Sequence, residues 1–232
     1  MLQPKLSEAS GRVGTSERGE DGVTTVAALI GDLVGSRRAG DRARLHGALT
    51  TALSRTRREV PAVHPLGVTV GDEFQGVYAT LGAALEASYR VRLALAGLGD
   101  ARFGIGLGTV TVVDEASGIQ DGSAWWAARE AVQRVEGLAE QPALAALRVR
   151  VVPAAGLPDP APELDAALAT LDFLLHRLDE RSARVLAGLL GGRTQREIAE
   201  TEGVSPSAVS QRVRRDGLEI AAGAIRRLRE AA

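Results

Sequence analysis

Acidic side chains follow two apolar segments of this chain, at positions where strand ends would bring them together. Asp32 follows the apolar run TTVAALIG, and Asp72 and Glu73 follow Gly71 between two short strand-like runs. Carboxylates on neighbouring strand ends are the hard oxygen ligands that Mg²⁺ takes, with phosphate and water completing its shell. The pattern therefore predicts a magnesium site formed by Asp32 and Asp72, with Glu73 as a supporting carboxylate.

Groups suited to bind phosphate come directly after Asp32. Gly35 and Ser36 form a tight turn whose backbone N–H groups can contact a phosphate, and Arg37 adds positive charge. Arg129, in a later helical segment, is expected to be a further phosphate contact. Each feature alone has a structural alternative, since a Gly-Asp pair is more often only a turn and a carboxylate can simply cap a strand end. Together they predict a metal–phosphate site.

A different pattern lies near the C-terminus, between Asp179 and Asp216. Thr194 and Glu197 have the spacing of a capping box at the start of the segment QREIAETE. Gly203 permits a sharp turn, and Ser205 is suited to cap the helix PSAVSQRVRR that follows. The spacing predicts a helix-turn-helix.

The second helix of this pair has an apolar and a polar face. Val209 and Val213 are expected to point inward, which leaves side chains suited to contact base edges and phosphates. These are Ser207, Ser210, Gln211, Arg212, Arg214 and Arg215. The predicted partner is DNA, and a two-fold DNA site would require a homodimer. The alternative is an ordinary helical hairpin with a solvated basic face.

The elements that must position the acidic residues follow a regular order. Strands are predicted at TTVAALIG, twice within LGVTVGDEFQGVYAT, in ARFGIGLGTVTVVD and at 147–152, and helices at 41–60, 81–95 and 123–136. Strand–helix–strand–strand–helix–strand is the ferredoxin-like order, here with an extra helix and strand. The predicted fold is α+β, with the palm-type core of nucleotide cyclases.

Composition shifts divide the chain. Residues 1–22 are rich in Ser, Gly and Glu and are predicted to be a disordered lead. Four prolines within 153–163 predict a semi-rigid spacer. The division gives an α+β domain at 23–152 and an all-α domain at 164–232 that carries the helix-turn-helix.

Bulk composition excludes several classes of function. The net charge of −1 provides no general attraction for nucleic acid, so binding must come from a local patch. The absence of cysteine excludes disulfides, thiolate chemistry and Cys-ligated zinc, and the three histidines lack ligand spacing. The polar N-terminus and the lack of a run of about 20 apolar residues argue against a signal peptide or a membrane span. A cytoplasmic protein is expected.

The segments ALIGDLVGSR, GDEFQG and DGSAWWAARE, together with the helix-turn-helix tail, resemble the SatD family. More distantly, they resemble class III nucleotide cyclases and GGDEF diguanylate cyclases. That resemblance implies that Asp32 and Asp72 match the two metal-binding aspartates and that Glu73 matches the acid that follows in GGDEF proteins.

This chain departs from the cyclase pattern at the residues that stabilise the transition state and at the residue that binds the nucleotide base. Trp125 stands four residues before Arg129, where cyclases carry an asparagine, and the segment 66–70 lacks the base-reading lysine. Catalysis needs such placed donors, so we expect this chain to bind a nucleotide better than it turns one over. One of the adjacent Trp125 and Trp126 is expected in the core or an interface, and the alternative is that the other stacks on a base.

These features predict a DNA-binding transcriptional regulator whose first domain binds Mg²⁺ and a nucleotide or similar phosphate ligand. Two alternatives stay open. One is an active nucleotidyl cyclase or related phosphoryl-transfer enzyme held on DNA. The other is a plain repressor in which the first domain is only a dimerisation scaffold.

Overall fold

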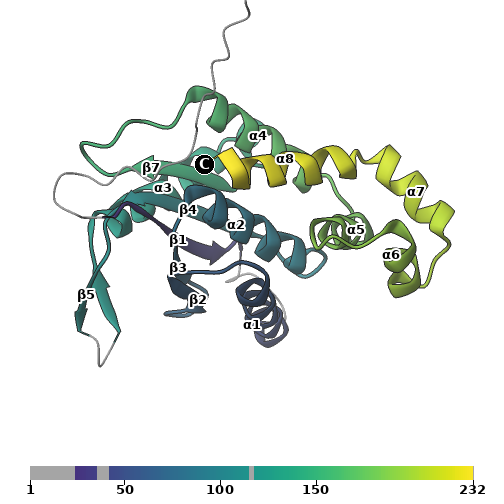
Figure 1. Ribbon diagram of the computed structural model, residues 1–232, viewed down its shortest axis with the longest axis horizontal. Helices are drawn as coiled ribbons and strands as arrows, with labels where there is room; N and C mark the ends of the chain where they lie inside the picture. The colour runs from purple at the N-terminus through teal and green to yellow at the C-terminus, as the bar shows by residue number, and fades with distance from the viewer. Residues whose placement is uncertain (1–23, 36–41, 115–117, 232) are drawn as a thin grey trace, which may run out of the picture.

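The computed structural model describes residues 24–35, 42–114 and 118–231 (Figure 1). The predicted lead at 1–22 and two predicted phosphate contacts, Ser36 and Arg37, lie outside these residues. The elements in chain order are β1 (Val26–Leu33), α1 (Arg42–Glu59), β2 (His64–Val68), β3 (Phe74–Tyr78), α2 (Leu81–Leu95), β4 (Ala101–Gly108), β5 (Thr111–Asp114), β6 (Ile119–Asp121), α3 (Ser123–Ala139), the short 3₁₀ helix η2 (Pro142–Leu144), β7 (Val149–Pro153), α4 (Pro162–His176), α5 (Glu180–Leu190), α6 (Gln195–Glu202), α7 (Pro206–Arg215) and α8 (Leu218–Ala231).

The main sheet has five strands in the order β2-β3-β1-β4-β7. β1 is antiparallel to both β3 and β4, and β7 joins β4 in parallel through α3. The order from β1 to β4 is the ferredoxin-like βαββαβ arrangement, and α3 with β7 is the extra helix and strand. The predicted α+β class and element order are confirmed, with helix ends shifted by a few residues.

β1 is buried on both faces of the sheet. Ala27 and Leu29 pack in the core cluster that includes residues of α1 and α2, whereas Ala28 and Ile30 pack against α3. A strand covered on both faces has little reason to alternate polar and apolar residues. This burial explains why β1 appears in the sequence as a continuous apolar run.

α3 lies unusually close to β4 because this strand carries glycines on the facing side. A Cβ atom at Gly106 would lie 2.1 Å from the carbonyl oxygen of Ala124, and one at Gly104 would lie 2.2 Å from the backbone nitrogen of Val132. The facing residues of α3 include Ala124 and Ala128, so two backbones meet with little side chain between them. This contact is the structural reason for the repeated glycines of ARFGIGLG.

The long strand predicted over ARFGIGLGTVTVVD is divided in two. β4 ends at Gly108, and β5 pairs with β6 in a separate two-stranded ribbon. Figure 1 shows this ribbon projecting from the sheet at the end opposite α7. The first part of the predicted strand is β4, and its last part is one arm of a hairpin.

The helices after β7 pack directly on the α/β part. Leu168 of α4 and Leu186 of α5 belong to the same buried apolar cluster as Leu85 of α2. α8 runs back along α2 (Figure 1), where a Cβ atom at Gly82 would lie 2.2 Å from the carbonyl oxygen of Arg229. The segments on either side of the predicted spacer thus share one core, and the division into two domains stays a prediction.

A buried ion pair fixes α4 against the sheet. Asp172 of α4 is fully buried and accepts hydrogen bonds from Arg92 of α2 at 2.7 Å and from the backbone N–H groups of Arg148 and Val149 at 2.7 and 3.0 Å.

β7 continues to Pro153 and α4 begins at Pro162, so both ends of the predicted spacer are in regular elements. Within the described ranges, no helix is both long enough and apolar enough to cross a bilayer.

Candidate functional site

A cavity of about 790 Å³ lies where β1 ends, β4 begins and the last turn of α3 comes to an end. The residues that line it include two of the predicted metal ligands and one predicted phosphate contact. The charged members are Asp32, Asp72, Arg102, Glu136, Glu140 and Arg148, and Gly35 also lines the cavity. The structure therefore brings Asp32 from the end of β1 and Asp72 from the β2–β3 turn to one cavity, as the sequence predicted.

The cavity lies beside the first residues of β4, before the glycines that bring this strand close to α3. Successive residues of a strand point to opposite faces, so Asp32 follows Ala28 and Ile30 on the face covered by α3. Arg102 is paired in register with Asp32 on the neighbouring strand, two residues before Gly104. At Gly104 the backbones of β4 and α3 meet closely, whereas Arg102 places a long charged side chain beside the last turns of α3. The space between sheet and helix is consequently polar here.

Asp32 is held by an imperfect ion pair. Nε of Arg102 lies 2.8 Å from Oδ1 of Asp32, but both atoms are buried without a well-directed hydrogen bond. Nη1 of Arg102 also lies 2.8 Å from Oε1 of Glu136. Burial raises the pKa of Asp32 to about 6, Arg102 opposes that rise, and the charges of Glu136 and Asp72 add to it. The negative charge at Asp32 is thus only partly compensated.

The structure describes a turn at Val34 and Gly35 directly after β1. The backbone N–H of Val34 donates to the carbonyl oxygen of Asp100 at 2.9 Å, and Gly35 has a φ of 71°, which favours glycine. A second cavity of about 320 Å³ shares Asp72 with the first and is bounded by His46 in the opening turns of α1. A helix N-terminus is a favourable environment for an anion.

Glu73 and Arg129 pair with each other instead of joining the cavity. The two guanidinium nitrogens of Arg129 donate to the two carboxylate oxygens of Glu73 at 2.5 and 2.8 Å. Neither residue is part of the described cavity lining. The geometry supports neither the predicted metal role of Glu73 nor the predicted phosphate role of Arg129, because each side chain already satisfies the other.

The donor set for a metal is accordingly small. No three His, Asp or Glu side chains converge as a metal site within residues 24–35, 42–114 and 118–231. Mg²⁺ is usually bound by one or two carboxylates together with phosphate and water. Asp32 and Asp72 are the two predicted ligands that line this cavity.

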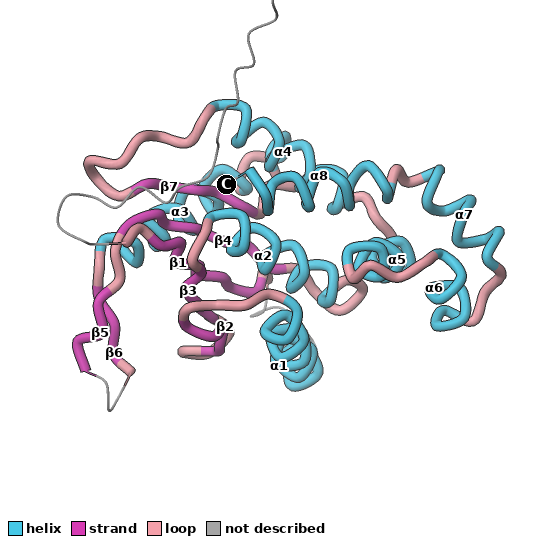
Figure 2. The backbone as a smooth tube through the Cα atoms, viewed as in Figure 1, coloured by secondary structure: helices cyan, strands magenta, loops and turns pink. Residues whose placement is uncertain are grey.

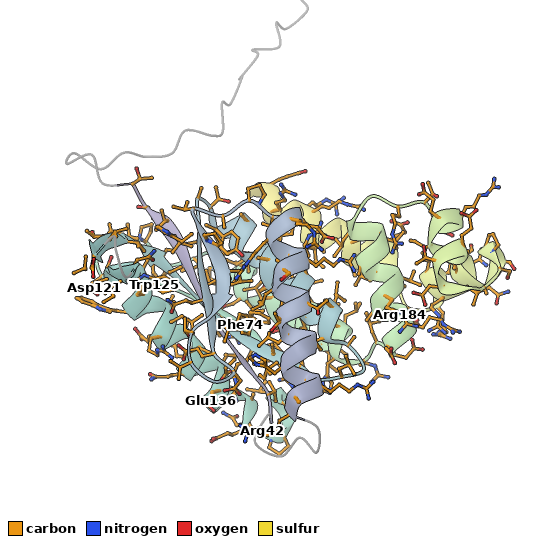
Figure 3. All side chains as sticks on the ribbon, turned by 90° about the horizontal axis from the view of Figure 1, so that it is seen from below. Arg42, Phe74, Asp121, Trp125, Glu136 and Arg184 are labelled. Carbon is orange, nitrogen blue, oxygen red and sulfur yellow. The ribbon has the colours of Figure 1, made fainter. Side chains whose placement is uncertain are left out.

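The two tryptophans do not reach this cavity. Trp125 packs against the cluster of Ala28 and Ile30, and Trp126 is 68% exposed. Figure 3 shows Trp125 and Glu136 well apart along the molecule, since they belong to opposite ends of α3. Partial burial against this cluster describes Trp125. Neither tryptophan lines the cavity, so its lining does not support the alternative in which one of them stacks on a base.

α6 and α7 form a compact pair joined by a short turn. The predicted capping box of Thr194 and Glu197 is present, and Gly203 ends α6 in the left-handed conformation with a φ of 64°. The Ser205 side chain accepts from the backbone N–H of Ala208 and caps α7. The sequence predicted each of these local features, and the structure confirms them.

The two faces of α7 also divide as predicted. Val209 and Val213 are buried. Ser207, Gln211, Arg214 and Arg215 are exposed, and Ser210 and Arg212 are partly buried. In Figure 2 the helix lies at the end of the molecule farthest from the β5–β6 ribbon.

Arg212 is already committed to a contact within the protein. Its guanidinium donates to the Asp179 carboxylate at 2.5 Å and to Oγ of Ser182 at 2.6 Å, which joins α7 to the start of α5. This hydrogen bond lowers the pKa of Asp179 to about 2. The predicted DNA contact by Arg212 is not supported by this position. Arg215 pairs with Asp216 at 2.6 Å but stays 62% exposed.

The SatD family model matches residues 26–231. The chain belongs to the SatD family. The predicted family resemblance is confirmed and extends from β1 through α8.

Solved structures similar to this SatD family protein are distant. A bacterial light-regulated adenylyl cyclase is 13% identical with a TM-score of 0.41, over 55% of this chain and 74% of that one. A regulator of polyketide synthase expression from Bifidobacterium adolescentis is 15% identical with a TM-score of 0.26, over 89% and 85% of the two chains. No curated protein matches.

Sequence reasoning missed four charged residues of the cavity in this SatD family protein. Arg102, Glu136, Glu140 and Arg148 all line it, and Arg102 and Glu136 contact each other. The signal for Arg102 was its strand register opposite Asp32, which becomes visible only when β1 and β4 are aligned as neighbours. Glu136 and Arg148 had no comparable local signal, because the end of α3 and the start of β7 meet only in the fold.

Proposed function

We propose that this SatD family protein is a DNA-binding transcriptional regulator whose α/β part binds a Mg-nucleotide or similar phosphate ligand. The observation that carries the DNA role is the outer face of α7. This helix has no acidic residue and exposes Ser207, Gln211, Arg214 and Arg215 while its valines are buried. The helix also lies at one end of the molecule, where a duplex can approach (Figure 1).

α7 is the proposed recognition helix. The major groove of DNA admits an α-helix, and side chains near the N-terminus of a recognition helix contact base edges there. Ser207 and Gln211 are the proposed base contacts. Arg214 and Arg215 are the proposed phosphate contacts. α6 would cross the backbone, and a homodimer would present two such helices to a two-fold site.

Salt-dependent DNA binding tests this role. Fluorescence anisotropy of a labelled mixed-sequence duplex measures the binding affinity at a series of salt concentrations. The slope of log affinity against log salt concentration is expected to become shallower by about two when Arg214 and Arg215 are both replaced by Ala. Arg58→Ala with Arg134→Ala is the matched control, because both arginines are exposed on helices remote from α7. Equal slopes for the α7 variant and the parent protein would exclude α7 as the DNA-contacting helix.

The ligand role is supported by the composition of the cavity. Asp32 and Asp72 would hold Mg²⁺, which would neutralise the phosphates of the ligand. Gly35 and the start of α1 border the same region and favour an anion. A ligand that prefers one arrangement of the protein would shift its population, and α8 packed on α2 gives a direct contact between the α/β part and the C-terminal helices.

Thermal unfolding in the presence of single nucleotides tests the ligand role. A ligand that binds only the folded protein raises its melting temperature with concentration. The increase is expected only with Mg²⁺ present and is expected to disappear in Asp72→Asn. The absence of any Mg²⁺-dependent increase would favour the view that the α/β part is only a scaffold.

An active nucleotidyl cyclase or phosphoryl-transfer enzyme is the second candidate, because Asp32 and Asp72 line one cavity. Incubation of the protein with each nucleoside triphosphate and Mg²⁺ separates the two roles. A product that is formed by the parent protein and lost in Asp72→Asn would favour the enzyme. Retained binding without any product would favour the regulator.

A further inference from the structure

Arg102 lies between two carboxylates of the cavity, one of which is the predicted metal ligand Asp32. It contacts Oδ1 of Asp32 and Oε1 of Glu136, each at 2.8 Å, and it lines the same cavity as Asp72. Its side chain is only 18% exposed. A guanidinium therefore already supplies positive charge at the predicted metal ligand.

The contact with Asp32 is poorly directed. Nε of Arg102 and Oδ1 of Asp32 are both buried, and neither has a hydrogen bond of good geometry despite their short separation. A buried polar atom without such a bond is costly, so this contact is weaker than its distance suggests. A better ligand for either atom would replace it.

The second arginine of the cavity differs from Arg102 in how it is held. Arg148 donates to Oδ2 of Asp100 and to the carbonyl oxygens of Ala145 and Leu147, all at 2.7 Å. These partners are structural groups outside the predicted metal set, so Arg148 is fixed. Arg102 is held by Asp32, the carboxylate that a cation would need, and by the half-exposed Glu136.

We infer that Arg102 is a built-in counter-ion for Asp32, which a divalent cation displaces and which then binds the phosphates of the ligand. This inference rests on the proposed Mg–phosphate site. Arg102 reaches the cavity that Gly35 borders, and a guanidinium recognises phosphate oxygens through paired hydrogen bonds. The exchange would make cation and phosphate bind together, because the cation frees the arginine that the phosphate needs.

The test uses the full chain with Mn²⁺ as the cation probe and inorganic triphosphate as the phosphate probe. Electron paramagnetic resonance measures Mn²⁺ binding without phosphate, and calorimetry measures triphosphate binding with Mg²⁺. Arg102→Gln is expected to strengthen Mn²⁺ binding about tenfold, equivalent to about 1.4 kcal/mol. It is expected to weaken triphosphate binding in Mg²⁺ by at least about tenfold, the loss of a charge-assisted contact. Arg134→Gln, an exposed arginine on the outer side of α3, is the control that should change neither value.

Arg102→Lys separates displacement from general electrostatics. Lysine keeps the charge but cannot contact both carboxylates through separate nitrogens of a planar group. Displacement predicts that Mn²⁺ binding strengthens in this variant too, whereas a purely through-space effect predicts no change. This variant also decides the question if circular dichroism shows that Arg102→Gln is not folded.

The outcomes distinguish the inference from the proposed function. If the parent protein binds Mn²⁺ and triphosphate but the Arg102 variants bind Mn²⁺ equally or more weakly, the counter-ion role is overturned and the site remains. If neither the parent protein nor the variants bind either probe, the ligand site and the counter-ion role are both overturned.

Discussion

Replacing Asp32 by Asn is expected to stabilise the protein at neutral and alkaline pH, although it removes a proposed metal ligand. Burial raises the pKa of Asp32 from its ordinary 3.8 to about 6. The folded protein therefore holds a proton on Asp32 more tightly than the unfolded chain does. Asparagine mimics the protonated form in shape and carries no charge, so it avoids the cost of ionisation in the folded state.

The sign and size follow from the two pKa values. Between pH 3.8 and 6, Asp32 loses its proton in the unfolded state but keeps it in the folded state, so the contribution of Asp32 to the free energy of unfolding falls as the pH rises. Above about pH 6, Asp32 is ionised in both states, and the destabilisation from its buried charge is complete. The difference between the two pKa values corresponds to at most about 3 kcal/mol. The Asp32 side chain is 31% exposed, and solvent screening reduces this to about 1–2 kcal/mol. For a chain of this size, the melting temperature is expected to rise by about 2–8 °C.

Thermal unfolding followed by circular dichroism, with chelator present, measures this effect. The advantage of Asp32→Asn over the parent protein is expected to be full at about pH 8 and to shrink toward about pH 4, where the folded parent is also protonated. Asp159→Asn, in the exposed loop before α4, is the control and should show no such pH dependence. A variant less stable than the parent at about pH 8, or an advantage independent of pH, would refute the argument.

Other expected outcomes concern packing, the buried ion pair and the turn before α7. Gly106→Ala is expected to destabilise the protein by at least about 2–3 kcal/mol in urea unfolding, because its Cβ would meet the backbone of α3. Gly137→Ala on the exposed side of α3 is expected to stabilise the protein by about 1 kcal/mol, because nothing lies within 4 Å of the added Cβ. Equal effects of the two substitutions would contradict close packing of β4 against α3. Asp172→Asn is expected to cost about 3 kcal/mol. Unlike Asp32, Asp172 accepts directed hydrogen bonds on both oxygens, from Arg92 and from two backbone N–H groups, so the amide N–H₂ of Asn would face a donor. Unchanged stability would mean that Asp100 alone satisfies Arg92. Gly203→Ala is expected to cost about 1–2 kcal/mol through its left-handed backbone, with faster hydrogen exchange in α7 as the local readout; unchanged exchange would count against strain at this turn.

The local structure of this protein follows from residues that are close in the sequence. The capping box of Thr194 and Glu197, the left-handed Gly203 and the cap at Ser205 each depend on contacts within a few residues. The buried valines of α7 follow from helical periodicity. The strand and helix order was predictable for the same reason, since each element is defined by its own pattern. The meeting of Asp32 and Asp72 followed from that order, because strand ends in a known topology become neighbours.

Only the tertiary structure decided which charges neutralise one another. Glu73 and Arg129 are 56 positions apart and pair because the β2–β3 turn meets the middle of α3. Arg212 turned inward because Asp179 at the start of α5 lies beside it. Arg102 reached Asp32 through the register of β1 and β4, and Glu136 through the end of α3. An ion pair depends on distances between elements that are far apart in the chain, and no periodicity or spacing within one segment encodes them.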